Sequence, residues 1–402
     1  MKVLVLNSGS SSQKSCVYEI GAALPDAPLS PLWEGKIEWE GECAKLRVRD
    51  SAGHETTEEV ESADRAGATR HLLGALTSSK VGVLKDKSEI AAVGHRIVNG
   101  GADYAQPVRI DAAVKSAIEK MAVFAPLHNR VELDGIRLIE EEFGQVTQVA
   151  VFDTGFHRKL PDAAAIYPGP YEWAERGIRR FGFHGINHKY CAERAALILG
   201  RKLRELRLVS CHLGNGCSLA AVRNGHSVDT TMGFTPLEGL MMGTRSGSVD
   251  PGILTFLLRG QKLSGEQLDD LLNKKSGLLG ISGVSSDMRL IVSAMKKGNA
   301  RARLAFDIFV HRLRAGIAAM LTALGGADAL VFTAGIGENS PEVRRAACAD
   351  LDFCGLVLDE RKNHAVTRDE DISAHQSAVR ILVLRAQEDW AIAKECWNLL
   401  RT

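Results

Sequence analysis

The stretch "VLVLNSGSSSQKSCVYEI", from Val3 to Ile20, places two apolar runs on either side of a small polar turn. The first run is rich in valine and leucine and stops at Asn7. One glycine and four serines then precede Gln13 and Lys14. Apolar runs bounded by Gly and Ser predict strands, so we expect this segment to fold as strand, turn and strand.

The turn has two interpretations. Turns of glycine and serine are common, and most of them bind no ligand. The alternative is an anion site, in which backbone N–H groups, hydroxyls and the lysine surround phosphate oxygens. The G-x-x-x-x-G-K-[ST] pattern of a Walker A loop is absent, and strand-like residues follow the turn instead of a helix. The rest of the chain has to decide between the two.

The stretch "RLVSCHLGNGCSLAAVRNG", residues 207–225, repeats the order of apolar strand, small turn and strand. Two copies, one in each half, predict a duplicated domain with one loop from each copy at a shared cleft. The chain has 402 residues, which exceeds one ordinary core. Elsewhere strand and helix patterns alternate, as in the expected helices 110–124 and 128–144 and the strand 145–153. We therefore expect an α/β protein of two domains.

Composition excludes several classes of function. The formal net charge is +1, which gives no electrostatic footprint for nucleic acid or an anionic membrane. No apolar run has the length of a membrane span. Met1 and Lys2 lead directly into a strand, so we expect no targeting segment. The eight cysteines are scattered without a C-x-x-C pair, which predicts a cytoplasmic protein with neither disulfides nor a zinc cluster.

Three Gly-rich turns, over 7–12, 214–216 and 335–339, each follow an apolar strand. An extended triphosphate needs several backbone contacts, so three such turns favour a nucleotide site. The third turn precedes a helix with Ser340 at the N-cap and Pro341 at the first position, and the end of a helix dipole attracts anions. The remaining pattern predicts a helix over 64–76, a Gly-rich joint over 276–283, a long helix over 302–324, and a last strand and helix over 379–400.

Two arginines and two carboxylates are candidates for a charged site. Arg96 and Arg245 lie in apolar, glycine-punctuated runs, which favours carboxylate or phosphate binding over the usual surface role of arginine. Asp153 and Glu388 end apolar strands, where each is either a cap or a ligand of Mg²⁺. Asn7 adds an amide oxygen to such a site.

The histidines of "HGINH", His184 and His188, have the i, i+4 spacing of zinc ligands. The glutamate of H-E-x-x-H is missing and Gly185 disfavours a regular helix, so we reject zinc binding. His184 is instead a candidate donor to a developing negative charge. His128 and His212 are weaker candidates for donors in a pocket, because histidines in protein cores are frequent.

A series of motifs, in order along nearly the whole chain, resembles the acetate kinase family. They are "LNSGSSSQK", "GHRIVNGG", "APLHN", "VFDTGFH", "RRFGFHGINHKY", "HLGNGCS", "MGTRSG", "SSDMR", "FTAGIGENS" and "RAQED". The resemblance implies the fold of the sugar kinase, chaperone ATPase and actin superfamily, with two ribonuclease-H-like domains and a nucleotide cleft between them. It implies an N-terminal domain over 1–153 completed by the helix 389–402, and a nucleotide-binding domain over 154–388.

The resemblance also implies an activity, namely reversible transfer of the γ-phosphoryl group of ATP to acetate with Mg²⁺, for which Mn²⁺ is the alternative metal. Asp153, His184 and Arg245 would be catalytic. The substrate would contact Arg96, Val98 and His128, and the metal would be held by Asn7 and Glu388. The implied ATP site consists of Ser12, Lys14, His212, Leu213, Gly214, Asn215, Gly216, Asp287, Met288, Arg289, Gly335, Ile336, Gly337, Glu338 and Asn339. The implied assembly is a homodimer, without nucleic acid or membrane partners.

Mechanism follows from the charges. Acetate is ionised at neutral pH, so catalysis needs alignment and charge neutralisation more than a general base. We therefore expect Asp153 to fix an arginine or metal-bound water and not to remove a proton.

The sequence departs from the family pattern at positions that include Ser248 and Met288, and two other functions are alternatives. Ser248 replaces a common aspartate, which is expected to loosen Arg245, and Met288 replaces an aromatic residue at the adenine. The rival enzyme is a propionate or butyrate kinase, although Val98, by family analogy, favours acetate. The rival from another class is an actin-like or chaperone-like nucleotide-gated binding protein.

Overall fold

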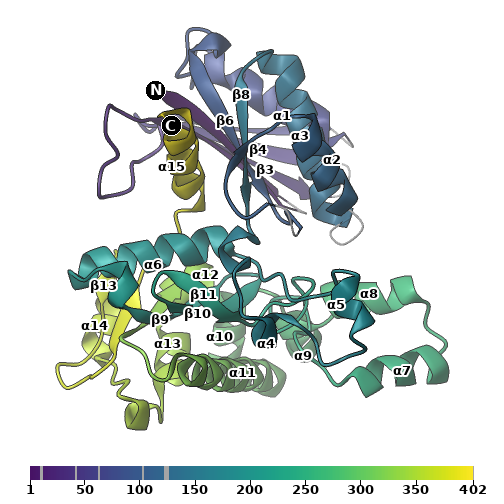
Figure 1. Cartoon of the computed structure of the whole chain (residues 1–402), viewed down its shortest axis with the longest axis vertical. Helices are drawn as coiled ribbons and strands as arrows, with labels where there is room; N and C mark the ends of the chain where they lie inside the picture. The colour runs from purple at the N-terminus through teal and green to yellow at the C-terminus, as the bar shows by residue number, and fades with distance from the viewer. Residues whose placement is uncertain (10–11, 41–42, 62–63, 102–103, 122–125, 402) are drawn as a thin grey trace. The chain divides into compact units, whose positions relative to one another are not determined.

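The computed structural model describes residues 1–9, 12–40, 43–61, 64–101, 104–121 and 126–401, without the side chains of residues 40 and 126–128 (Figure 1). The chain forms two compact units. Unit 1 contains Met1–Gly155 and Gln387–Thr402, and unit 2 contains Phe156–Ala386. Within the described residues, no helix has both the length and the apolar character needed to cross a membrane.

Unit 1 is built on one mixed sheet with the strand order β5-β4-β3-β2-β1-β6-β8-β7. Its strands are β1 (Lys2–Ser8), β2 (Ser12–Glu19), β3 (Trp33–Glu40), β4 (Cys43–Asp50), β5 (Glu55–Glu61), β6 (Ile90–Ile97), β7 (Val108–Arg109) and β8 (Thr147–Phe152). The central strand β1 is antiparallel to β2 and parallel to β6, which is in turn parallel to β8. The carboxyl ends of β1, β6 and β8 therefore meet at one edge.

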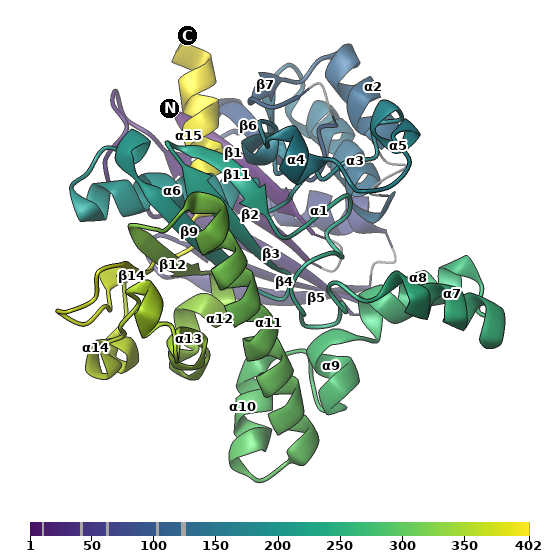
Figure 2. The same cartoon turned by 60° about the horizontal axis from the view of Figure 1, so that its bottom comes forward.

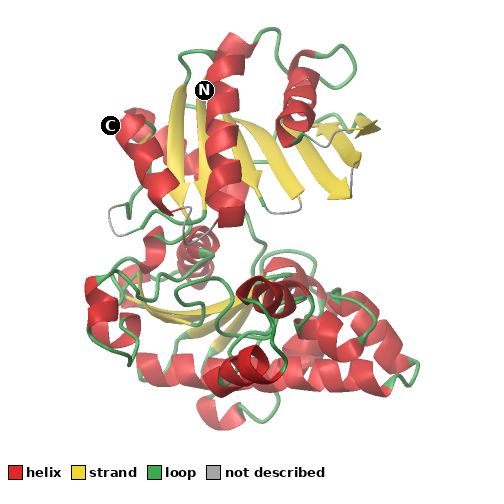
Figure 3. Ribbon diagram, turned by 90° about the vertical axis from the view of Figure 1, so that its right-hand side faces the viewer, coloured by secondary structure: helices red, strands yellow, loops and turns green. Residues whose placement is uncertain are grey.

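Helices cover both faces of this sheet. The helices are α1 (Arg65–Gly74), α2 (Ala112–Met121), α3 (Pro126–Phe143) and α15 (Glu388–Arg401). Leu4 and Leu6 of β1 belong to the same buried cluster as residues of α1 and α3. Helix α15 packs on the opposite face, where Ile392 and Cys396 leave no room for a side chain at Gly94 (Figures 1 and 3). The last segment of the chain thus completes the core of the first unit.

Unit 2 repeats this topology in a second sheet with the order β11-β10-β9-β12-β14-β13. The strands are β9 (Arg207–Leu213), β10 (Cys217–Arg223), β11 (His226–Thr230), β12 (Ala329–Thr333), β13 (Glu370–Asp371) and β14 (Arg380–Val383). Strand β9 is antiparallel to β10 and parallel to β12, as β1 is to β2 and β6. The five strands β11-β10-β9-β12-β14 thus match β3-β2-β1-β6-β8 in order and direction, which confirms the predicted duplication.

The helices of unit 2 include the long helix expected from the sequence. They are α4 (Asp162–Ala165), α5 (Glu172–Glu175), α6 (Gly185–Leu199), α7 (Pro251–Gly260), α8 (Gly265–Lys274), α9 (Gly277–Ser282), α10 (Met288–Lys296), α11 (Ala300–Leu324), α12 (Ala334–Asn339), α13 (Pro341–Cys348) and α14 (Glu360–Ala365). Helix α11 packs on β10 and ends at Gly325, whose φ of +67° is the usual glycine C-cap geometry. Helices α7 and α8 extend away from the sheet of unit 2 (Figure 2).

Three local expectations were wrong. The segments 335–339 and 276–283 are mostly helical, in α12 and α9, where we expected a turn and a joint. Each begins in the left-handed region, at Ala334 (φ +64°) and Gly277 (φ +62°), so the strained first residue lets a short helix follow directly. Gly185, expected to disfavour a helix, is the first residue of α6. The sequence also gave no signal for β5, whose residues are mostly charged or threonine.

Candidate active site

The first cluster of the site is an ion pair at the edge of the unit 1 sheet. Arg96 lies near the end of β6 and Asp153 directly follows the neighbouring parallel strand β8. Arg96 Nη2 donates to Asp153 Oδ2 at 2.7 Å, and Asp153 is fully buried. Burial alone lowers the pKa of Arg96, but the charges of Asp153, Glu388 and Glu132 outweigh it and raise that pKa above its usual value. The guanidinium is therefore a fixed cation.

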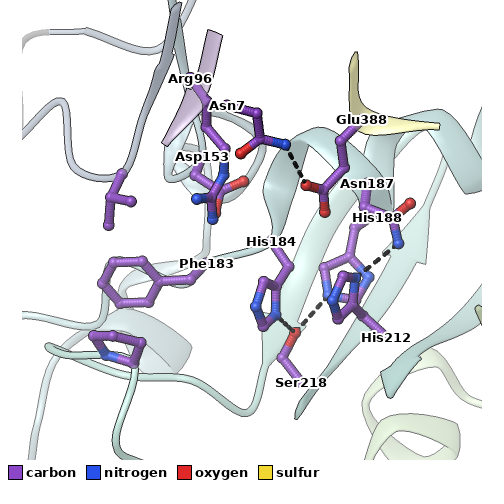
Figure 4. A network of polar contacts seen from close by, with 12 residues as sticks. Asn7, Arg96, Asp153, Phe183, His184, Asn187, His188, His212, Ser218 and Glu388 are labelled. Atoms are coloured by element: carbon purple, nitrogen blue, oxygen red, sulfur yellow. Dashed lines mark hydrogen bonds and ion pairs between the residues drawn. The ribbon is translucent and has the colours of Figure 1, made fainter. Parts of the chain in front are cut away.

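The second cluster of unit 1 joins its first strand to its last helix. Asn7, near the end of β1, donates through Nδ2 to Glu388 Oε2 at 3.3 Å (Figure 4). The same amide donates to Asp389 Oδ1 at 3.0 Å. Burial raises the pKa of Glu388, Arg96 opposes this shift, and Asp153 and Asp389 add to it. Several carboxylates thus crowd one buried position, where a cation would relieve their repulsion.

These residues fit a magnesium ion. The oxygen atoms of Asn7 and Glu388 are hard ligands, and Mg²⁺ binds proteins through one or two carboxylates while keeping waters and substrate phosphates. Among the described residues there is no group of three or more His, Cys, Asp or Glu side chains arranged to hold a metal. Asn7 and Glu388 would supply two oxygen ligands, and water or substrate oxygens would take the remaining positions of the ion.

Lys14, expected in the first phosphate loop, lies in β2 directly opposite Asn7. Its Nζ is 2.9 Å from Asp389 Oδ2 and 3.5 Å from Glu34 Oε2. Ser12 begins β2, and its carbonyl accepts a hydrogen bond from Gly9 at 2.7 Å. Two further serines of the turn, residues 10 and 11, lie outside the described residues.

A buried carboxyl group that the sequence analysis missed holds the backbone after Arg96. The N–H of Val98 donates to both carboxyl oxygens of Glu132, at 3.2 and 3.1 Å. Burial raises the pKa of Glu132 to about 8, while Arg96 and this hydrogen bond act in the opposite direction. A charged residue on the apolar face of the helix 128–144 was the available signal. Val98 is itself buried, and the side chain of His128 lies outside the described part of the structure.

In unit 2, the structure brings together two of the three residues expected to be catalytic. Gly216 ends the turn between β9 and β10, and a side chain there would place its Cβ 3.5 Å from Arg245 Nη1 and 3.5 Å from His184 Nε2. The ring of His212 stacks on that of His184, with centroids 3.9 Å apart. A glycine therefore leaves open a space lined by a guanidinium and an imidazole.

His184 belongs to a buried chain of hydrogen bonds that the sequence did not predict (Figure 4). Its Nδ1 is 2.9 Å from the hydroxyl of Ser218, and the same hydroxyl is 2.8 Å from Nε2 of His188. His188 Nδ1 is in turn 2.9 Å from Ser210 Oγ. Burial, followed by the nearby His157 and His212, lowers the pKa of His188 far below its usual value. His188 is therefore neutral, and each of its ring nitrogens contacts a serine hydroxyl.

His184 has a left-handed backbone conformation, and His157 holds the segment that precedes it. Gly182 and His184 both have positive φ, at +73° and +56°. His157 Nε2 donates to the carbonyl of Phe183 at 3.0 Å, and its ring fills the space where Gly182 would carry a side chain. A left-handed histidine is costly unless its surroundings fix it, and such strain concentrates at functional sites.

Arg245 is anchored without the aspartate that Ser248 replaces. Its Nη1 donates to the carbonyl of Pro236 at 3.0 Å. Ser248 Oγ accepts from the N–H of Gly239 at 3.0 Å, and the N–H of Ser248 donates back to Gly239 at 2.9 Å. The serine thus closes the loop that carries the arginine.

A pocket of about 620 Å³ lies within unit 2. Its lining includes eight residues of the expected ATP site, namely Gly214, Asn215, Asp287, Met288, Arg289, Gly335, Ile336 and Asn339. Ser286, Val292, Ser340 and Glu342 also line it and were not expected. The buried hydroxyl of Ser340 has no hydrogen-bond partner among the described residues and does not cap α13. A polar ligand in this pocket would satisfy it.

Seven residues of the expected ATP site do not line this pocket. Ser12 and Lys14 belong to unit 1, His212 and Gly216 lie beside His184, and the other three are Leu213, Gly337 and Glu338. Leu213 is buried in β9, Gly337 packs on the backbone of Phe332, and Glu338 accepts from the N–H of Ala386 at 2.9 Å. Arg344, which the sequence analysis missed, is fully buried and donates to the carbonyls of Gly337 and Glu338. These residues fix α12, whose first turn forms one wall of the pocket.

The comparisons agree with this fold. The profile of the acetokinase family matches residues 2–394, so the chain belongs to the acetokinase family. An acetate kinase from Cyanothece sp. is 56% identical over 404 residues, covering 100% of this chain and 99% of the relative. The crystal structure of Porphyromonas gingivalis acetate kinase has a TM-score of 0.92 at 40% identity, covering 99% of both chains. A propionate kinase from Francisella tularensis has a TM-score of 0.89 at 37% identity, covering 98% of both chains.

Proposed function

We propose that the protein is an acetate kinase, which transfers the γ-phosphoryl group of ATP directly to acetate in a reversible reaction. Membership of the acetokinase family and the full-length similarity to acetate kinases support this activity. The observation that carries it in the structure is the buried pair of Arg96 and Asp153, because it presents a fixed cation beside the Asn7–Glu388 cluster. A carboxylate substrate needs such a partner.

The chemistry joins two anions, so the residues act by placing positive charge and hydrogen-bond donors. Arg96 orients the carboxylate of acetate through its planar guanidinium. Asp153 holds Arg96 and takes no proton, because acetate is already ionised. Arg245 and His184 donate to the oxygens of the phosphoryl group as it is transferred, where preorganised donors contribute most. Mg²⁺ or Mn²⁺, held by Asn7 and Glu388, would supply charge neutralisation on the phosphates.

The nucleotide occupies the pocket of unit 2. Gly214 and Asn215 come from the β9–β10 turn, and Gly335 and Ile336 from α12. Met288 contributes an adaptable apolar surface in place of an aromatic ring. Met288 and Ser340 both line this pocket, which supports a ligand with an apolar face and polar edges, such as adenine.

A hydroxamate assay for acyl phosphate tests this function. The purified protein, ATP and Mg²⁺ would be incubated with acetate, propionate or butyrate, and with acetate plus excess EDTA. We expect acetate to give the highest kcat/KM and EDTA to abolish the product. A higher kcat/KM for propionate would favour the alternative of a propionate kinase, for which the Francisella tularensis structure is the supporting observation. Failure with all three acids would favour a nucleotide-gated binding protein.

Shortening Val98 is expected to change the preferred acid. Val98→Ala should raise the propionate-to-acetate ratio of kcat/KM by about 10-fold, because one methylene in an apolar pocket contributes this order of discrimination. The matched control is Val149→Ala, which shortens a buried valine within β8. An equal change of the ratio in both variants would contradict a role of Val98 in the acyl pocket.

The assembly we propose is a homodimer that buries α7. Ile253, Phe256 and Leu258 of this helix are 47%, 65% and 40% exposed, and none of the described residues of α7 is buried. Exposed apolar clusters of this kind mark interfaces, and closed two-fold dimers are the commonest assembly.

Light scattering after gel filtration tests the dimer. The wild type should have twice the mass of one chain, and Phe256→Glu should shift it toward the monomer. Phe353→Glu, which alters an equally exposed aromatic residue outside α7, should remain dimeric. A monomeric wild type would contradict the assembly.

We propose a cytoplasmic location on the basis of the cysteines. The eight cysteines form no disulfide in the described part of the chain, and most are buried. Reduced thiols of this number suit a reducing compartment.

A further inference from the structure

The buried chain from Ser210 to His184 can hold its protons in only a few ways. It consists of Ser210, His188, Ser218 and His184, joined by three contacts of 2.9, 2.8 and 2.9 Å. Each serine hydroxyl has one hydrogen to donate, and a neutral imidazole has one N–H and one bare nitrogen. Ser218 Oγ meets a ring nitrogen on each side and has a single hydrogen, so it can donate to only one of the two histidines.

His188 sets the direction of the whole chain because it is neutral. If it donates through Nε2 to Ser218, the Ser218 hydroxyl donates to His184 Nδ1 and the Ser210 hydroxyl donates to His188 Nδ1. If it donates through Nδ1 to Ser210, every hydrogen bond reverses, and His184 then carries a proton on Nδ1. In the first direction neutral His184 carries its proton on Nε2, and in the second direction Nε2 is bare.

The surroundings of His184 within unit 2 disfavour a cationic ring, so only the first direction places an N–H on Nε2. The reversed direction supplies an N–H at Nε2 only if His184 becomes a cation. Nε2 and Arg245 Nη1 lie on the same site beside Gly216, so a second positive charge there would be repelled. The stacked ring of His212 accepts at Nδ1 from Asn187 Nδ2 at 2.8 Å, which makes it a neutral ring and no counter-charge.

We propose that Ser218 and His188 are positioning residues that hold His184 as a neutral imidazole with its proton on Nε2. This inference rests on the proposed phosphoryl transfer for its role, although the tautomer is a property of the free protein. With the proton on Nε2, His184 donates to a phosphoryl oxygen and adds no charge that would hold the product. With the proton on Nδ1, a lone pair would face the anionic phosphoryl group.

Histidine ring nitrogens report the tautomer directly. The full-length protein, labelled with ¹⁵N in its histidine rings, would be studied by NMR at neutral pH, and the signals of His184 assigned from their loss in His184→Gln. We expect a protonated Nε2 and a bare Nδ1 in the wild type. A protonated Nδ1, alone or together with Nε2, would overturn the proposal, whether or not acetate proves to be the substrate.

Variants of Ser218 connect the tautomer to turnover. Ser218→Ala should lower kcat by about 10²-fold, as loss of one transition-state donor does, and leave KM for ATP nearly unchanged. Its His184 signals should no longer show the Nε2–H form alone. Ser218→Thr keeps the hydroxyl and should restore both the tautomer and most of kcat. An unchanged tautomer and kcat in Ser218→Ala would contradict the proposal.

A matched control and a second variant separate this effect from a general loss of structure. Ser227 is also a buried serine bonded to a buried histidine, because its hydroxyl is 2.8 Å from His157 Nδ1. Ser227→Ala should leave the proton of His184 on Nε2. If Ser218→Ala does not fold, Ser210→Ala interrupts the chain one contact further away and should populate both tautomers of His184. Retention of one pure tautomer there would count against the chain.

Discussion

Replacing Arg245 with alanine is expected to lower kcat by about 10³-fold or more, as loss of an arginine that contacts a transferred phosphoryl group does. The affinity for ADP should change little. Arg245 Nη1 lies beside Gly216 and His184 Nε2, whereas the residues that line the nucleotide pocket do not include it. Steady-state kinetics in both directions, with calorimetry for ADP, measure the two effects separately.

Two variants sharpen this experiment. Arg245→Lys keeps the positive charge but loses the planar fork, so its kcat should lie between those of the wild type and the alanine variant. Arg223→Ala removes an exposed arginine of β10 whose partner is the carbonyl of Ala323, and it controls for a change of surface charge in unit 2. A kcat near normal in Arg245→Ala would contradict the role assigned to this residue.

Replacing Asp153 with asparagine is expected to reduce both stability and affinity for acetate. Asp153 is fully buried and holds Arg96 at 2.7 Å, and removing one partner of a buried ion pair costs about 3–5 kcal/mol because the other charge stays buried. Thermal unfolding should therefore shift to a lower Tm, and KM for acetate should rise because Arg96 is no longer fixed.

The control for this variant is an exposed pair in the same unit. Arg137 is 3.3 Å from Asp134 on the surface of α3, and an exposed pair contributes about 0–1 kcal/mol. Asp134→Asn should leave Tm and KM nearly unchanged. If Asp153→Asn lost kcat alone, with normal Tm and normal KM for acetate, the residue would act on a proton and our account of it would be wrong.

The sequence predicted the repeated topology and the site residues that lie at the ends of buried strands. The repeated order of strand, small turn and strand predicted two units of the same topology, and both sheets have it. Arg96 and Asp153 were each predicted as site residues from their positions at the ends of buried strands, and the structure joins them because those strands are parallel neighbours. Local pattern is sufficient for contacts of this kind.

The sequence could not predict the contacts that depend on how distant elements pack. Ser218 has the pattern of an ordinary strand residue, and only the packing of α6 on the sheet places it between two histidines. Arg344 is a charged residue on an amphipathic helix, and nothing local indicates that it is buried, whereas the position of Glu132 on the apolar face of its helix is a local signal of burial. Helix α12 was missed because its glycines have low helix propensity, which its tertiary contacts override.

The contact between Asn7 and Glu388 joins residues 381 positions apart, and all of unit 2 lies between them in the chain. During translation, β1 therefore leaves the ribosome long before α15 is synthesised. Asn7 cannot contact Glu388 until all of unit 2 has been synthesised. The pair that would bind the metal is consequently among the last tertiary contacts to form. A nascent chain that stops short of Gln387 can complete the sheet of unit 2, but it lacks the helix that covers one face of the sheet of unit 1.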